Sequence, residues 1–196
     1  MNYLAHAYLS FRDPSWITGN LISDMVKGRK RYDYPRGIQQ GITLHRAIDE
    51  FTDSDPATKA AKEIFRPAYR LYSGAFVDVV YDHFLANDPL HFESETALAE
   101  FTAYTYNAVL NNYPSIPAAF YTLFDRMRQQ NWLYNYRSKW GIEKSFGGLV
   151  WRSKYLTESS SALTLFEENY DALKNAYRQF FPGVYQFAID FTKENF

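Results

Sequence analysis

Hydrophobic residues recur at helical spacing along nearly the whole chain. Leu4, Tyr8 and Phe11 follow an i, i+4, i+7 pattern, and Ile17 and Leu21 repeat at i, i+4. No segment alternates apolar and polar residues over the length of a strand, as a half-buried β-strand would. The sequence therefore predicts an all-α fold, arranged as a helical bundle.

Prolines and glycines divide this pattern into separate helices. The expected helices cover residues 4–11, 14–25, 35–53, 56–66, 74–88, 93–113, 117–140 and 160–196. We expect Pro67 to interrupt the fourth helix and Pro182 to kink or divide the last one. Glycines between residues 141 and 153 indicate a loop or a broken helix. Without a repeat or linker, the chain is expected to form one domain over residues 1–196, with a helical C-terminal half over 91–196.

Two polar residues lie among the apolar positions of the expected helix over residues 35–53. At about 100° per residue, Ile42, His45 and Asp49 fall within about 40° of Ile38 on the helical wheel. The opposite face carries polar and small residues, so the helix already has a solvent-exposed side. Because His45 and Asp49 are spaced i, i+4, their side chains reach one patch. This placement indicates a polar site on the inner face.

Further polar residues accompany apolar stripes within residues 1–90. His6 and His83 occupy such stripes, Asp82 precedes His83 directly, and Asp24 lies on the helix over residues 14–25. Each also has a structural interpretation, since a buried histidine can be a hydrogen-bonded core residue and an aspartate can cap a helix or pair with an arginine such as Arg46.

Taken together, these residues indicate a metal site. Burying several carboxylates costs several kcal/mol each unless a cation or paired donors compensate, and no set of buried lysines or arginines accompanies them. A divalent cation would remove this cost. Mixed imidazole and carboxylate ligands suit Mn²⁺, Fe²⁺ or Mg²⁺ better than a structural zinc site.

Composition excludes several other chemistries. The chain has no cysteine, so disulfides, zinc fingers, iron–sulfur clusters and cysteine nucleophiles are excluded. The chain also lacks several catalytic motifs: phosphate-binding glycine loops, HExxH, the Glu-x-x-His pair of di-iron bundles and a serine nucleophile elbow.

The net charge of −1 argues against general nucleic-acid binding. No apolar run suits a membrane span and no signal peptide is evident, so a cytoplasmic protein is expected.

Four blocks of the sequence resemble, in order and spacing, the motifs of the acyl carrier protein phosphodiesterase family, also called holo-ACP hydrolases. The blocks are MNYLAHAYLS, GNLISDMVKGR, YPRGIQQGITLHRAIDEFTDSDP and VVYDHFLAND. A looser similarity continues through NWLYNYRSKWGIEKSFGGL. The resemblance implies an all-helical fold distantly related to HD-type metal phosphohydrolases, dependence on Mn²⁺, and release of 4'-phosphopantetheine from the serine of holo acyl carrier protein.

The resemblance also implies roles for individual residues. The expected metal ligands are Asp24, His45 and one or both of Asp82 and His83. Asp49 is expected to orient the attacking water or to support the ligands, and His6 or His83 to protonate the leaving serine.

Cationic residues are concentrated between Met25 and Arg46, where only Asp33 is acidic. The basic residues are Lys27, Arg29, Lys30, Arg31, Arg36 and Arg46. They suit either a solvated turn or an anionic partner. Because acyl carrier proteins are acidic, the resemblance implies that the segment Lys27–Arg31 guides the carrier, and that Arg46 reaches a phosphate oxygen.

Two other functions fit parts of the sequence. An HD-like hydrolase acting on a nucleotide or another small phosphodiester would use the same metal ligands. A non-catalytic helical protein could bind a metal, or bind haem through His6 or His83. Neutralising the basic segment would separate the first alternative from a carrier-protein enzyme, and a visible absorption spectrum would reveal haem.

Overall fold

The computed structural model describes all residues from 1 to 196 and contains helices without any strand. The all-α prediction is therefore confirmed. The α-helices are α1 Tyr3–Tyr8, α2 Pro14–Ile22, α3 Arg36–Ser54, α4 Pro56–Tyr69, α5 Ser73–Ala86, α6 Glu95–Asn111, α7 Ala118–Gln129, α8 Trp132–Asn135, α9 Lys139–Arg152, α10 Ser160–Glu168 and α11 Tyr170–Asn195. Short 3₁₀ helices are η1 Ser23–Met25, η2 Gly28–Asp33, η3 Arg70–Tyr72 and η4 Tyr113–Ser115.

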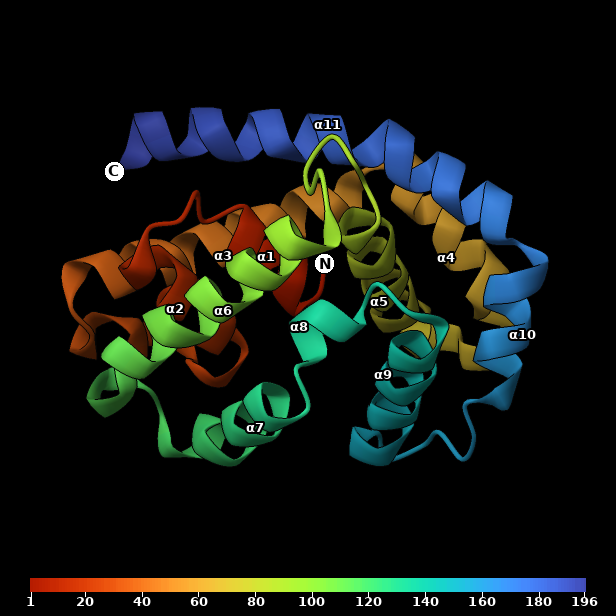
Figure 1. The fold of residues 1–196 in the computed structure, drawn as a ribbon, viewed down its shortest axis with the longest axis horizontal. Helices are drawn as coiled ribbons and strands as arrows, with labels where there is room; N and C mark the ends of the chain where they lie inside the picture. The colour runs from red at the N-terminus through yellow and green to blue at the C-terminus, as the bar shows by residue number, and fades with distance from the viewer.

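The helices form two groups that meet at the N-terminus. Figure 1 shows α2, α3 and α6 on one side and α4, α5, α9 and α10 on the other, with α11 running across both. The short helix α1 lies between the groups and contacts both α2 and α5. Side chains of α1 therefore occupy the centre of the molecule.

Helices α2 and α3 cross in backbone contact because each carries a glycine at the crossing. A Cβ atom on Gly19 would lie 2.1 Å from the Ile38 carbonyl oxygen, and one on Gly41 would lie 2.3 Å from the Trp16 carbonyl oxygen. Both positions therefore require glycine, which permits this close approach. The contact brings the end of α2 and the following η1 beside the middle of α3.

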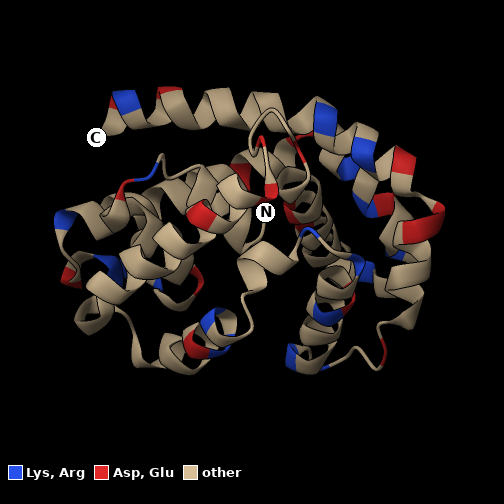
Figure 2. Cartoon of the chain, in the orientation of Figure 1, with Lys and Arg blue, Asp and Glu red and all other residues tan.

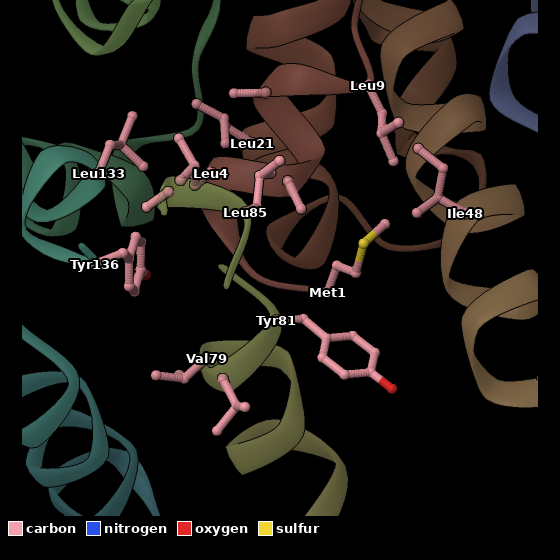
Figure 3. Close-up of a cluster of buried hydrophobic side chains, with 14 of the residues drawn as sticks. Met1, Leu4, Leu9, Leu21, Ile48, Val79, Tyr81, Leu85, Leu133 and Tyr136 are labelled. Atoms are coloured by element: carbon pink, nitrogen blue, oxygen red, sulfur yellow. The ribbon is translucent and has the colours of Figure 1, made fainter. Parts of the chain in front are cut away.

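The buried hydrophobic residues form one continuous cluster. Its residues come from widely separated parts of the chain, and Figure 3 labels Met1, Leu4, Leu9, Leu21, Ile48, Val79, Tyr81, Leu85, Leu133 and Tyr136. Helix α5 is buried on all sides, as eleven of its fourteen residues are buried. No helix has the length and apolar character that a membrane crossing requires.

Three expected helix boundaries were wrong. Helix α4 continues through Pro67 and ends before Arg70, whose φ is 47°. Pro67 has no N–H to donate to the Glu63 carbonyl. Because Glu63 is exposed, water can donate to this carbonyl instead. The helix expected over residues 117–140 divides at Asn131, which adopts the left-handed conformation. The last helix divides at Asn169 rather than at Pro182, which lies within α11.

The loop or broken helix expected over residues 141–153 was also wrong, because α9 is continuous there. Of its three glycines, Gly147 and Gly148 lie in the helix interior, where each costs about 1 kcal/mol. The burial of Ile142 and Phe146 in the core offsets this cost. Gly141 has a packing role, since a Cβ atom there would lie 1.8 Å from the Asn135 carbonyl oxygen.

Candidate metal centre

Three elements bring two histidines and two aspartates together beside the α2–α3 crossing. His6 comes from α1, Asp24 from η1, and His45 and Asp49 from successive turns of α3. His45 Nε2 lies 3.2 Å from Asp24 Oδ1 and 3.0 Å from Asp49 Oδ2, while His6 Nε2 lies 3.2 Å from Asp49 Oδ1. The His6 and His45 rings stack with their centroids 4.0 Å apart.

The group is open on its carboxylate side and closed on its imidazole side. The exposed fractions of the Asp24 and Asp49 side chains are 74% and 42%, whereas those of His6 and His45 are 3% and 9%. A molecule in solution can therefore reach the carboxylates, behind which the two rings are held by the core.

His6 is the residue with unmet bonding capacity. Neither of its ring nitrogens makes a hydrogen bond, although both are buried; the contact with Asp49 lacks the alignment of one. A buried polar atom without a partner is costly. Three possible ligand atoms, one each from His6, His45 and Asp49, lie within 4.8 Å of one another. The group therefore fits a divalent cation, which would accept the free His6 lone pair.

The charges of the two rings differ. Burial and the positive charge of His45 lower the pKa of His6 to about 4, so this ring is neutral at pH 7. Burial opposes the charge on His45, but the carboxylates of Asp24 and Asp49 outweigh it and raise the pKa of His45 to about 9. The hydrogen bond to His45 lowers the pKa of Asp24. Burial would raise the pKa of Asp49, yet its contacts with both rings hold it far below the usual range.

These pKa values predict a pH dependence for the stability of the metal-free protein. A histidine pKa raised from about 6.5 to about 9 gives stabilisation that is complete below pH 6.5 and is lost as the pH rises through 9. We expect the free energy of unfolding, measured by urea titration with chelator, to fall between pH 6.5 and 9.5 by up to about 3 kcal/mol. His6 is neutral in the folded protein throughout this range, and in the unfolded chain it loses its charge near pH 6.5, so it contributes little above about pH 7.5.

The matched variant is His45→Gln, in which this decrease should largely vanish. A smaller slope above pH 8 should remain, since the pKa of the Met1 ammonium is also raised. An unchanged pH dependence in His45→Gln would contradict the assigned charge.

A second charged contact lies beside the group. The Met1 ammonium is 3.1 Å from Asp78 Oδ1 and 3.8 Å from Asp49 Oδ1. The ammonium thus links α5 to the Asp49 carboxylate. Neither Met1 nor Asp78 was singled out from the sequence.

Asp82, an expected metal ligand, binds the protein backbone instead of joining this group. Its carboxylate accepts hydrogen bonds from the backbone N–H of Leu4 at 2.7 Å and of Ala5 at 3.1 Å. It is fully buried, and burial raises its pKa to about 7 against the effect of these bonds. Asp82 therefore fixes the start of α1, the helix that carries His6.

We expect Asp82→Ala to lower the free energy of unfolding of the metal-free protein by about 3 kcal/mol, because two buried N–H groups lose their acceptor. Urea denaturation with chelator measures this. Asp13→Ala is the matched control: Asp13 also accepts two backbone bonds, at the start of α2, but is more exposed, so a loss of about 1 kcal/mol is expected. Loss of metal from Asp82→Ala with unchanged metal-free stability would instead support Asp82 as a ligand.

His83 lies in an aromatic cluster and contacts none of His6, Asp24, His45 or Asp49. Its Nδ1 donates to the Tyr136 carbonyl at 2.8 Å, and its ring packs against Phe166 and other aromatic rings. The structure therefore brings together four of the six expected residues. The fourth histidine, His91, lies outside the site beside Tyr8.

The basic segment Lys27–Arg31 begins three residues after Asp24. Lys27, Arg29 and Lys30 are exposed, and neither they nor Arg31 form an ion pair. Figure 2 shows acidic residues at the end of α10 and both signs of charge along early α11, whereas this segment supplies cations only. Arg46 donates to the Val26 carbonyl at 2.8 Å and so ties the start of the segment to α3.

Sequence reasoning missed Asn20, whose side-chain oxygen lies 3.1 Å from His45 Nδ1. The sequence does contain a pattern that points to Asn20. Asn20 is four residues before Asp24 and three after Ile17, so it shares their helical face. It is a buried polar residue in an apolar stripe, like His45 itself.

The fold and the site define an all-α protein whose helices gather imidazole and carboxylate groups at one solvent-accessible point, the ligand set of metal-dependent hydrolases. Sequence comparison identifies the family. The model of the acyl carrier protein phosphodiesterase family matches residues 1–184, and the chain belongs to this family.

Relatives from several bacteria support this assignment. The chain is 35% identical to the acyl carrier protein phosphodiesterase of Enterobacter sp. (strain 638) over 184 residues, which cover 94% of this chain and 95% of the relative. It is 32% identical to the protein of the same name from Klebsiella pneumoniae over 188 residues, covering 96% and 97%. No solved structure matches significantly, so the HD-like arrangement remains a prediction.

Proposed function

We propose that the chain hydrolyses the phosphodiester bond between 4'-phosphopantetheine and the serine of holo acyl carrier protein, leaving the apo carrier. The observation that carries this proposal is the group of His6, His45 and Asp49, whose ligand atoms lie within 4.8 Å of one another. The choice of substrate is supported by the relatives, which are named for action on this carrier.

In this proposal His6, His45 and Asp49 hold a divalent ion, and Asp24 lies at its open side. Imidazole and carboxylate ligands suit Mn²⁺, and Fe²⁺ or Mg²⁺ are compatible. When bound, the ion supplies a Lewis acid that activates water and positive charge that offsets the charge developing on the phosphodiester. We leave Asp82 and His83 out of the ligand set, because their polar groups are bound within the protein.

The remaining steps fall to the protein's own groups. Asp49 contacts both rings and so keeps them at a fixed separation. Asp24 is the most exposed member and is ionised, which suits it to orient the attacking water by accepting a hydrogen bond. A pKa of about 4 makes the His6 ring a poor proton donor at pH 7, which favours a ligand role. The N–H groups of Arg46 that do not bind Val26 are available for a phosphate oxygen.

Mass spectrometry of the carrier tests this function. We expect holo carrier incubated with the protein and Mn²⁺ to lose the whole 4'-phosphopantetheine group, and chelator to slow this conversion by roughly 100-fold or more. Retention of phosphate on the carrier serine would show cleavage of a different bond and would contradict the proposal. Full activity in chelator-treated, metal-free protein would contradict the metal requirement.

A further inference from the structure

A chain of three hydrogen bonds runs behind the two histidines. Asn20 Oδ1 lies 3.1 Å from His45 Nδ1, and Asn20 Nδ2 donates to Ser10 Oγ at 3.0 Å. Ser10 Oγ in turn donates to the His6 backbone carbonyl at 2.9 Å. Asn20 and Ser10 are both fully buried, so no solvent competes for these bonds.

The direction of every bond in this chain follows from its last member. Helix α1 ends at Tyr8, and the His6 carbonyl in its last turn accepts no backbone N–H. It therefore depends on the single hydroxyl proton of Ser10. With that proton committed, Ser10 Oγ can only accept from Asn20. The amide nitrogen of Asn20 must then face Ser10, and the amide oxygen must face His45.

An amide oxygen can only accept a hydrogen bond, so His45 Nδ1 has to carry a proton. We propose that Asn20 is a positioning residue that fixes His45 as the Nδ1-protonated form and leaves Nε2 as the nitrogen available to a cation, with Ser10 fixing the orientation of the Asn20 amide. Nε2 is the nitrogen that faces Asp24 and Asp49.

This chain of hydrogen bonds keeps a proton off the nitrogen of His45 that faces the carboxylates. Without Asn20, a neutral His45 ring would place its proton on Nε2, because the two carboxylates there are the better acceptors. That proton would occupy the position of a metal bond. The chain of hydrogen bonds also joins α1, α2 and α3, so it couples the backbone of His6 to the ring of His45. The metal part of this inference rests on the proposed function; the position of the proton does not.

Nitrogen-15 NMR of the His45 ring in the metal-free protein at about pH 10.5 tests the proton position, because the ring is neutral above its pKa of about 9. We expect Nδ1 to be protonated in the wild type and unprotonated in Asn20→Leu, where the buried N–H would have no acceptor. Asn20→Asp retains an oxygen acceptor and should restore the protonated Nδ1. Ser10→Ala should give an intermediate result, because the amide is then free to turn. An unprotonated Nδ1 in the wild type, or a protonated one in Asn20→Leu, overturns the proposal.

Zinc titration calorimetry tests the consequence for the cation. We expect Asn20→Leu to weaken Zn²⁺ binding about 10- to 100-fold, as replacement of a group that orients a ligand does, and Asn20→Asp to weaken it less. Thr18→Val is the matched control, since Thr18 is also buried on α2 and its hydroxyl bonds the Pro14 and Ala108 carbonyls and the Asn112 amide, none of them in the site. It should lower stability without changing Zn²⁺ affinity. Equal loss in both variants would show that Asn20 acts only through stability. If the wild type binds no Zn²⁺, the proposed metal centre fails, while the NMR result still decides the proton position.

Discussion

Replacing His6 or His45 by alanine is expected to lower kcat/KM on holo carrier protein by about 1,000-fold. Each ring is one of the three groups proposed to hold the ion, and the ion's stabilisation of transition-state charge is worth several kcal/mol. A loss of about 4 kcal/mol corresponds to this factor. The effect should appear in kcat as well as in kcat/KM, because the ion acts on the chemical step.

Metal content and folding must be measured beside the rate. We expect both variants to lose bound Mn²⁺ by elemental analysis and to retain the helical circular dichroism of the wild type. His91→Gln is the matched control, because His91 is a partly buried histidine outside the site, and it should keep both metal and rate. Near-normal activity of His6→Ala would remove His6 from the ligand set. Release of metal by His83→Gln would restore the ligand set implied by the family resemblance.

Reversing the charges of Lys27, Arg29 and Lys30 to glutamate is expected to reduce kcat/KM on holo carrier protein by at least about tenfold at low salt. These three side chains are exposed and unpaired, so they are free to attract an acidic partner. Surface charges act mainly on association. Added salt should therefore narrow the difference, since it screens charges over about 10 Å at 0.1 M, and kcat should change little.

Three other exposed cations without ion pairs form the matched control. They are Lys59, Arg178 and Lys193. Their replacement by glutamate changes the net charge equally but leaves the segment beside Asp24 intact, so the carrier reaction should be nearly unchanged. An equal loss of kcat/KM in the two triple variants would show that overall charge, and not the segment Lys27–Arg31, causes the effect. Unaltered kcat/KM in the first variant would show that Lys27–Arg31 is a solvated turn.

Local sequence patterns were sufficient for the helices and for half of the site. Periodicity depends on neighbouring residues of one helix, so the all-α fold and the extent of α3 follow from the chain alone. The pairing of His45 with Asp49 is equally local, because residues four apart on a helix share a face. The boundaries that were wrong depend on contacts beyond the helix, as in α9, where packing of Ile142 and Phe146 outweighs two internal glycines.

Only the tertiary structure could decide which distant residues meet. Asp82 and His83 are adjacent in sequence, yet one binds the start of α1 and the other lies in an aromatic cluster, because neighbours on a helix point about 100° apart. His6 reaches His45 because α1 lies between the two groups of helices, and Asp24 and Asn20 reach it because Gly19 and Gly41 let α2 and α3 touch. A sequence pattern records which face of a helix is buried. It does not record which other helix covers that face, and packing in three dimensions decides this.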